Sequence, residues 1–72
     1  MIIYTITFTD GTERKTEPGV RLVYRLGWLA IQRYKYDPTF GDEGYSWWED
    51  ATVFSSERIA HVTTEEVPNA PV

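Results

Sequence analysis

A chain of 72 residues with no cysteine and a net charge of −4 is long enough for one small domain. A domain of this size buries only about 60% of the surface that its unfolded chain exposes, so it usually needs a staple, an oligomer interface or dense packing. The lack of cysteine excludes disulfides and thiolate metal sites, and the single histidine excludes a multi-histidine zinc site. The excess of acids argues against a generic phosphate-binding surface, because non-specific nucleic-acid affinity depends on clustered Lys and Arg.

Aromatic residues are the expected substitute for a staple. The chain carries three Trp, five Tyr and three Phe, and each aromatic ring buries a large area. No apolar run approaches the roughly 20 residues of a membrane-spanning helix. The start, MIIY, has neither the positive region nor the cleavage site of a signal peptide. We therefore expect a soluble, cytoplasmic domain without a membrane segment.

The start of the chain predicts a hairpin. Residues 2–8 are almost all β-branched or aromatic and alternate Thr with larger apolar side chains, which is typical of a strand with one buried face. Asp10-Gly11 follows as a hairpin turn signal, because Gly tolerates positive φ. Residues 12–17 are wholly polar and predict an exposed edge strand whose charges discourage edge-to-edge pairing. Pro18-Gly19 then turns the chain.

Residues 20–36 fit two different periods. Their apolar positions match an amphipathic helix over the whole segment, but from Val20 to Leu26 they also alternate with polar positions. A helix would place Gly27 in its interior at a cost of about 1 kcal/mol. Two strands that meet near Leu26-Gly27 avoid this cost. We favour the two strands and keep the helix as the alternative.

A loop and a long strand follow. Residues 37–44, DPTFGDEG, combine one Pro, two Gly and three acids, which predicts a loop. Residues 45–54 predict the long strand, in which neighbouring side chains point to opposite faces. Simple alternation gives one face with Tyr45, Trp47, Glu49, Ala51 and Val53 and another with Ser46, Trp48, Asp50, Thr52 and Phe54. One of Trp47 and Trp48 should therefore belong to the core, and the pattern leaves open which.

The end of the chain predicts a turn, a strand and a tail. Residues 55–58 offer a Ser cap for a single helical turn, and residues 59–63 predict a last short strand. Residues 65–72 contain two Pro and little to bury, so we expect a disordered tail after a single domain at residues 1–64. This order of elements favours an all-β fold, a small and strongly bent antiparallel barrel of five or six strands. Closure would remove the exposed edges of an open sheet.

Two stretches of the chain resemble known proteins. The last third, SWWEDATVFSSERIAHV, resembles the end of SH3-like or Sm-like small β-barrels, where a long strand leads through one helical turn into a closing strand. Residues 2–63 are similar to short accessory proteins of unknown role from bacteriophages of actinobacteria, with DGT after the first strand, a GWL strand and a WWED…VF…ERIA ending. The resemblance implies a fold and a phage origin, with the host cytoplasm as location. It implies no activity, because small barrels host many unrelated functions.

Acidic residues around the loop are the nearest approach to a catalytic or metal site. Carboxylates can act as general acid and base or bind a hard cation. The loop lacks the spacing of a calcium site, however, and Glu49 and Asp50 should face opposite sides of their strand. We interpret the acids as a solvated face that keeps an aromatic-rich domain soluble. They are Asp37, Asp42, Glu43, Glu49 and Asp50.

Other candidates for catalysis have simpler interpretations. His61 stands without a nearby Ser or Cys nucleophile pattern, so we expect a half-buried packing residue. Ser55-Ser56 lacks the glycines of a nucleophile elbow and is interpreted as a cap. We therefore expect no enzyme activity, no cofactor and no metal.

Aromatic residues gather on both sides of the acidic loop. Filling a small core explains about half of them, because alternation turns the others outward. Outward aromatic residues with mixed charge are typical of protein interfaces. The candidate partner-binding residues are Tyr34, Tyr36, Phe40, Asp42, Glu43, Tyr45, Trp47 and Trp48.

Three functions follow from these residues. The preferred one is a non-enzymatic module that binds a protein, such as a host or defence protein with a basic groove if the chain is phage-encoded. The second is a single-stranded nucleic-acid binder in which aromatic residues stack on bases beside cations, although we expect no such binding because acids outnumber cations. Its residues would be Tyr34, Tyr36, Trp48, Arg21, Arg25, Arg33 and Lys35. The third is a structural homo-oligomer such as a virion component, and the small core favours self-association in any case.

Overall fold

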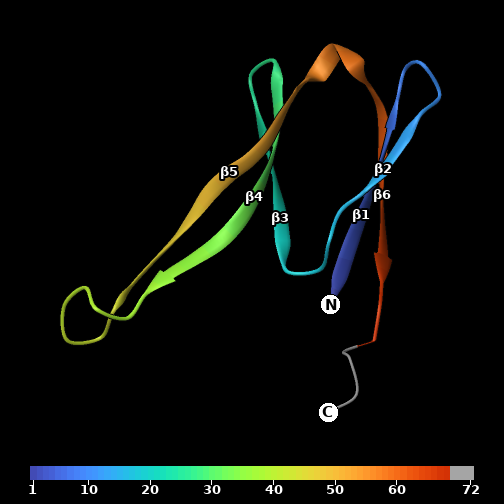
Figure 1. The fold of residues 1–72 in the computed structure, drawn as a ribbon. Helices are drawn as coiled ribbons and strands as arrows, with labels where there is room; N and C mark the ends of the chain where they lie inside the picture. The colour runs from blue at the N-terminus through green and yellow to red at the C-terminus, as the bar shows by residue number, and fades with distance from the viewer. Residues whose placement is uncertain (69–72) are drawn as a thin grey trace.

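The computed structural model describes residues 1–68, which form six strands and one 3-10 turn (Figure 1). The elements are β1 (Ile2–Phe8), β2 (Glu13–Lys15), β3 (Val20–Arg25), β4 (Trp28–Asp37), β5 (Tyr45–Ser55), η1 (Ser56–Arg58) and β6 (Ile59–Glu66). The prediction of an all-β domain with one short helical turn is therefore confirmed. No helix in the described part of the chain is long and apolar enough to cross a membrane.

The strands form two separate antiparallel sheets, in the orders β2-β1-β6 and β3-β4-β5. Figure 1 shows them side by side, with η1 bridging them at one end. No backbone ladder joins the two sheets within residues 1–68, so the expected closed barrel is wrong. Closure needs paired edge strands, but β3 and β6 are not paired, and Tyr24, Ile59 and Val62 line an apolar depression between them.

The core lies between the two sheets and is small. Ile6 and Leu29 are fully buried, and Phe8 and Ile31 complete the cluster. Burying one such side chain stabilises the fold by about 1.5–3 kcal/mol. Partly buried neighbours close the core from both sheets: Val20, Leu22, Phe54, Ile59 and Val62.

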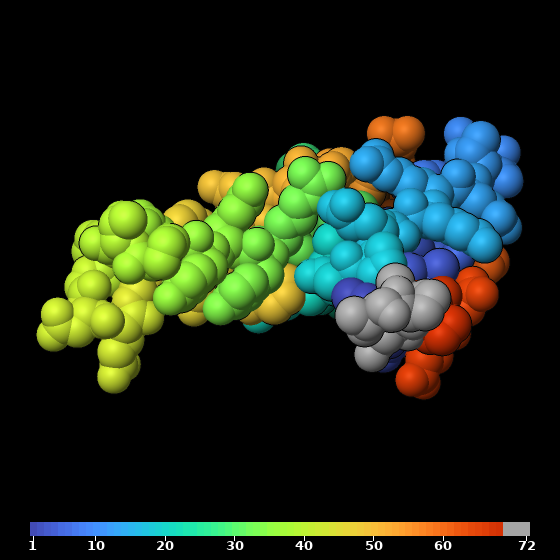
Figure 2. All heavy atoms as spheres, turned by 60° about the horizontal axis from the view of Figure 1, so that its bottom comes forward, coloured from blue at the N-terminus to red at the C-terminus, as the bar shows by residue number. Residues whose placement is uncertain are grey.

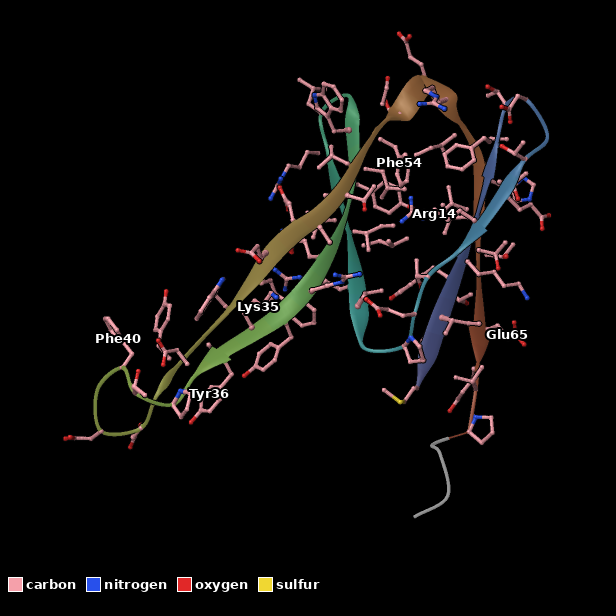
Figure 3. The ribbon with its side chains drawn as sticks, in the orientation of Figure 1. Arg14, Lys35, Tyr36, Phe40, Phe54 and Glu65 are labelled. Atoms are coloured by element: carbon pink, nitrogen blue, oxygen red, sulfur yellow. The ribbon has the colours of Figure 1, made fainter. Side chains whose placement is uncertain are left out.

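Aromatic rings join the two sheets at the core. Phe8 of β1 meets Phe54 of β5 edge to face, with ring centroids 5.2 Å apart. Arg14 of β2 also lies over Phe54, its guanidinium carbon 5.6 Å from the ring centroid (Figure 3). The polar strand β2 therefore contributes to the core through a guanidinium laid over an aromatic ring.

Residues 20–36 form two strands, as favoured from the sequence. β3 and β4 pair from Val20↔Arg33 to Arg25↔Trp28 and leave Leu26-Gly27 as a two-residue turn. Gly27 has φ 80°, which matches the positive φ that the second central residue of a type II turn requires. The helix alternative is thereby excluded for this segment.

A bulge in β5 changes the faces predicted for the long strand. Thr52 pairs with Ile31 and Asp50 with Gln32, so Ala51 has no partner across the ladder. Because an extra residue shifts the alternation by one, Trp47 shares the face of Phe54, and Trp48 lies on the opposite face. The predicted grouping was wrong for this reason. Neither tryptophan belongs to the core cluster.

The final strand is longer than predicted. β6 runs to Glu66, and Met1 and Val67 exchange two backbone hydrogen bonds of 2.8 and 3.0 Å. Glu65 and Glu66 therefore belong to the sheet and not to a tail, because pairing with β1 orders them. The rest of the predicted tail lies partly outside the described residues.

Two smaller expectations for this end of the chain also change. Ser55 occupies the position before η1, but its side chain makes no capping hydrogen bond. His61 is exposed instead of half-buried, because a bulge opposite Thr7 and Phe8 turns Ile59 and Val62 toward the core and leaves His61 facing solvent beside Thr7.

Candidate functional site

The hairpin of β4 and β5 projects beyond the rest of the molecule. β3 begins at Val20, opposite Arg33, so residues 34–37 of β4 pair only with residues 45–48 of β5. Figure 2 shows this hairpin extending away from the two sheets. The radius of gyration is 14.7 Å, against about 11 Å for a compact chain of this length. All eight candidate partner-binding residues lie in the projecting hairpin, which we define as residues 34–48.

The register divides these candidates between two faces. Asp37 pairs with Tyr45 and Lys35 with Trp47, so these four side chains share one face. Tyr34 pairs with Trp48 and Tyr36 with Ser46, which places both tyrosines on the other face. The structure thus separates a single predicted surface into two clusters.

The first cluster lies at the end of the hairpin. The rings of Phe40 and Tyr45 lie 5.5 Å apart between centroids, and Tyr45 stacks on Trp47 at 5.6 Å with an interplanar angle of 26°. Together with Asp37 these rings line an open depression of about 380 Å³. The exposed fractions are 65% for Phe40, 53% for Tyr45 and 36% for Trp47. We call these four residues the tip cluster.

Local hydrogen bonds hold the loop that carries the tip cluster. Asp37 Oδ1 accepts hydrogen bonds from the backbone N–H of Thr39, at 2.9 Å, and from its hydroxyl, at 2.6 Å. These bonds, the hydroxyl bond first, lower the pKa of Asp37 below its ordinary value. On the other side of the loop, the Tyr36 hydroxyl donates to the carbonyl of Glu43 at 3.3 Å.

Gly44 allows Tyr36 to approach the loop so closely. Its φ is 79°, and a Cβ at this position would overlap the phenol ring of Tyr36. Only glycine therefore fits both the backbone conformation and the packing. Figure 3 shows Phe40 and Tyr36 on opposite sides of the hairpin end, so Tyr36 supports the loop from the face away from the tip cluster.

The end of the hairpin carries negative charge without internal compensation. No Lys or Arg occurs between residues 36 and 57. Four ion pairs occur within the described chain, and none of them involves Asp37, Asp42 or Glu43. One of these carboxylates, Asp37, lines the depression beside the aromatic rings, and the other two lie in the same loop; no cation of the described chain is paired to any of the three.

The second cluster surrounds Trp48, on the other face of the hairpin. The Arg21 guanidinium lies 4.4 Å from the centroid of Trp48, and Tyr34 meets the same ring edge to face at 5.5 Å. Arg21 Nε also donates to Gln32 Oε1 at 2.7 Å, and Gln32 Nε2 donates to Asp50 Oδ1 at 2.8 Å. We call these five residues, Arg21, Gln32, Tyr34, Trp48 and Asp50, the Trp48 cluster.

Gln32 and Asp50 join this cluster to β3. Gln32 is only 5% exposed, and both ends of its amide are bonded, which satisfies a polar group that would otherwise be costly to bury. Asp50 Oδ2 accepts a hydrogen bond from Arg25 at 2.9 Å. The bonds from Gln32 and then Arg25 lower the pKa of Asp50. Sequence reasoning missed Gln32, because the pairing of β3 with β4 and β5 had to be known first.

The cations proposed for nucleic-acid contact are already engaged. Arg21 lies on Trp48, Arg25 bonds Asp50, and Arg33 bonds Glu17 at 2.7 Å. Lys35 lies 3.9 Å from Glu49. Each positive charge near the aromatic residues therefore has a partner within the chain. Among residues 1–68, no three His, Asp or Glu side chains gather as ligands for a metal ion.

Comparison of this chain with protein-family models, with curated proteins and with solved structures finds no match. The function is therefore argued from the two clusters.

Proposed function

We propose that this protein is a non-enzymatic interaction module that binds a protein partner through the tip cluster. The observation that carries the proposal is the exposure of three touching aromatic rings at the end of a projecting hairpin. Protein interfaces are enriched in Trp, Tyr and Phe, and a few such rings dominate the binding energy. Asp42 and Glu43 form the polar rim of this surface, and Tyr36 supports it.

Tyr34 and Trp48, by contrast, act as the foundation of the hairpin in this proposal. The two rings contact each other edge to face, and Arg21 covers the ring of Trp48, so Trp48 offers less free surface to a partner, whereas Tyr34 stays 53% exposed. The same contacts weigh against base stacking by Trp48, because a base would have to displace a guanidinium.

The cellular setting belongs to the same proposal. The order β5, η1, β6 matches the ending of SH3-like and Sm-like barrels and supports a fold of that kind in an open form. We propose a phage accessory protein that acts in the host cytoplasm on a host or defence protein.

A capture experiment tests the proposal. The tagged protein is incubated with host lysate beside the Trp47→Ala and Trp28→Ala variants. Trp28 is an exposed tryptophan at the opposite end of β4, with an exposed fraction of 52%, and therefore serves as a matched control. We expect a protein that is retained by the wild type and by Trp28→Ala but lost with Trp47→Ala. Equal capture by all three proteins would contradict the proposal.

A homo-oligomer is the second candidate. The buried apolar core is small, and Tyr24 and Leu26 are exposed at the β3–β4 turn. Apolar surface of this kind favours self-association. We expect a dimer or larger assembly at micromolar concentration in sedimentation velocity, and a clean monomer at millimolar concentration would contradict this.

A further inference from the structure

We propose that the tip cluster binds a cationic side chain of the protein partner, and an arginine in preference to a lysine. The inference rests on the proposed function and adds the chemistry of the partner. It is supported by the exposed rings of the tip cluster, by carboxylates that have no ion-pair partner, and by the contacts that the arginines of this chain make with aromatic rings.

The ring faces supply the first argument. Phe40, Tyr45 and Trp47 line one depression together with the carboxylate of Asp37. The face of an aromatic ring carries negative electrostatic potential and attracts a cation that lies over it. A depression of about 380 Å³ is large enough for the end of an arginine or lysine side chain, and its walls are both apolar and negative.

Charge supplies the second argument. Asp37 lines the depression, and neither it nor Asp42 nor Glu43 has an ion-pair partner in the described chain. The nearest cation on this face, Lys35, lies 3.9 Å from Glu49. A phosphate or carboxylate ligand would meet repulsion at this site, whereas a cation would meet attraction from the rings and the acids at once.

The order of the loop supplies the third argument. The bonds from Thr39 to Asp37 and from Tyr36 to Glu43, together with the positive φ of Gly44, hold the loop before any ligand arrives. A binding site that is already arranged loses less conformational entropy on binding. The loop that carries Phe40 is therefore held by its own hydrogen bonds, and the three rings of the depression contact one another.

The preference for arginine follows from contacts within the chain. Three guanidinium groups lie over aromatic rings in the described residues, namely Arg14 over Phe54, Arg21 over Trp48 and Arg58 over Phe8. None of them covers a ring of the tip cluster. A planar guanidinium stacks on a ring and still donates hydrogen bonds in its plane, as Arg21 does toward Gln32. An arginine over Trp47 could in the same way donate to Asp37.

Short capped peptides test the inference directly. The full chain, labelled with ¹⁵N, is titrated with Gly-Arg-Gly, Gly-Lys-Gly and Gly-norleucine-Gly, and binding is followed by NMR at the Trp47 indole and at the backbone of Tyr45. Norleucine has an apolar side chain like that of lysine but no charge. We expect affinity to fall from arginine to lysine to norleucine. Equal affinity for norleucine and arginine, or no shift at the tip cluster with arginine, would overturn the inference.

Three variants sharpen the test. Trp47→Ala should weaken arginine binding by about tenfold or more, and Trp28→Ala should leave it unchanged. Asp37→Asn removes the charge but keeps an oxygen that can accept the bonds from Thr39, so we expect a loss of a few fold that disappears at high salt. An Asp37→Asn variant that binds arginine as well as the wild type at low salt would contradict the role of the carboxylate.

The two proposals can fail separately. A partner that is captured through Trp47 but is indifferent to added arginine peptide would support the interaction module and overturn the cation site. If the arginine peptide binds the tip cluster but no protein is captured through Trp47, the interaction module is contradicted and the cation site is supported.

Discussion

Trp47 and Trp48 are neighbours in the sequence and have opposite surroundings. Trp48 is partly buried between the Arg21 guanidinium and the ring of Tyr34. Among the ring–ring and cation–ring contacts of the described chain, Trp47 makes only one, with the exposed ring of Tyr45. Both residues nevertheless lie in the same strand, β5.

The difference lies in where the cation comes from. β3 pairs with residues 28–33 of β4, next to the base of the projecting hairpin, and places Arg21 over the ring of Trp48. β3 does not reach the end of the hairpin, because it begins opposite Arg33. The tip cluster therefore receives no cation from β3, and no guanidinium of the described chain covers its rings. We infer that Trp48 supports the hairpin and that Trp47 contacts a partner.

The largest expected effect is the loss of Trp48. Trp48→Ala removes the ring on which Arg21 and Tyr34 pack. We expect the free energy of unfolding to fall by about 1–3 kcal/mol, less than for a fully buried tryptophan because the ring is only partly covered. Urea unfolding followed by circular dichroism measures this. A change below about 0.5 kcal/mol would show that the Trp48 cluster is not a foundation.

The second largest loss of stability is expected on substitution of Gln32. Gln32→Ala leaves Arg21 and Asp50 without their shared partner in a nearly buried position. We expect a loss of about 1–2 kcal/mol in the free energy of unfolding. Thr63→Ala, at an exposed position of β6, is the control and should change stability by less than about 0.5 kcal/mol. Equal effects of the two substitutions would show that the hydrogen bonds of Gln32 with Arg21 and Asp50 do not stabilise the fold.

The next effect in size is expected at low pH, where protonation of Asp50 in the Trp48 cluster should lower the stability of the fold. The pKa of Asp50 in the folded chain lies below its ordinary value of 3.8 because of its bonds to Gln32 and Arg25. The unfolded chain therefore takes up the proton first, and this contribution to stability is complete above pH 3.8 and is lost as the pH falls through the folded pKa. The effect is small, because solvent screens this exposed group.

Asp50→Asn tests this dependence. Urea unfolding at pH 6 and at pH 3 should show a smaller loss of stability in the variant than in the wild type. Asp10 and Asp37 also have lowered pKa values through their bonds to Thr12 and Thr39, so part of the acid sensitivity remains. An identical loss in variant and wild type would rule out a contribution from Asp50.

The smallest effect on stability is expected for Trp47. Trp47→Ala removes a ring that is more than a third exposed, so the free energy of unfolding should change by no more than about 0.5 kcal/mol. Binding should nevertheless be lost in the capture and titration experiments. A destabilisation equal to that of Trp48→Ala would show that both rings support the fold and would erase the distinction between them.

Local patterns in the sequence were enough to predict most of the strands and their turns. The alternation of residues 2–8, the Asp10-Gly11 signal and the break at Leu26-Gly27 all correspond to elements in the structure. The reason is that alternation and turn chemistry act over a few neighbouring residues, so they are legible without knowledge of the rest of the fold. The sequence also indicated the hairpin region in which the exposed aromatic residues lie.

The tertiary structure decided which residues share a face and which rings stay free. The bulge at Ala51 reverses the predicted faces of Trp47 and Trp48, and the strands form two separate sheets in place of the predicted closed barrel. A bulge depends on the register of two strands, and closure depends on whether distant edges can pair. Neither is encoded in a local pattern. The engagement of Trp48 by Arg21 likewise required β3 to lie beside the hairpin, because only strand pairing brings residues so far apart in the chain together.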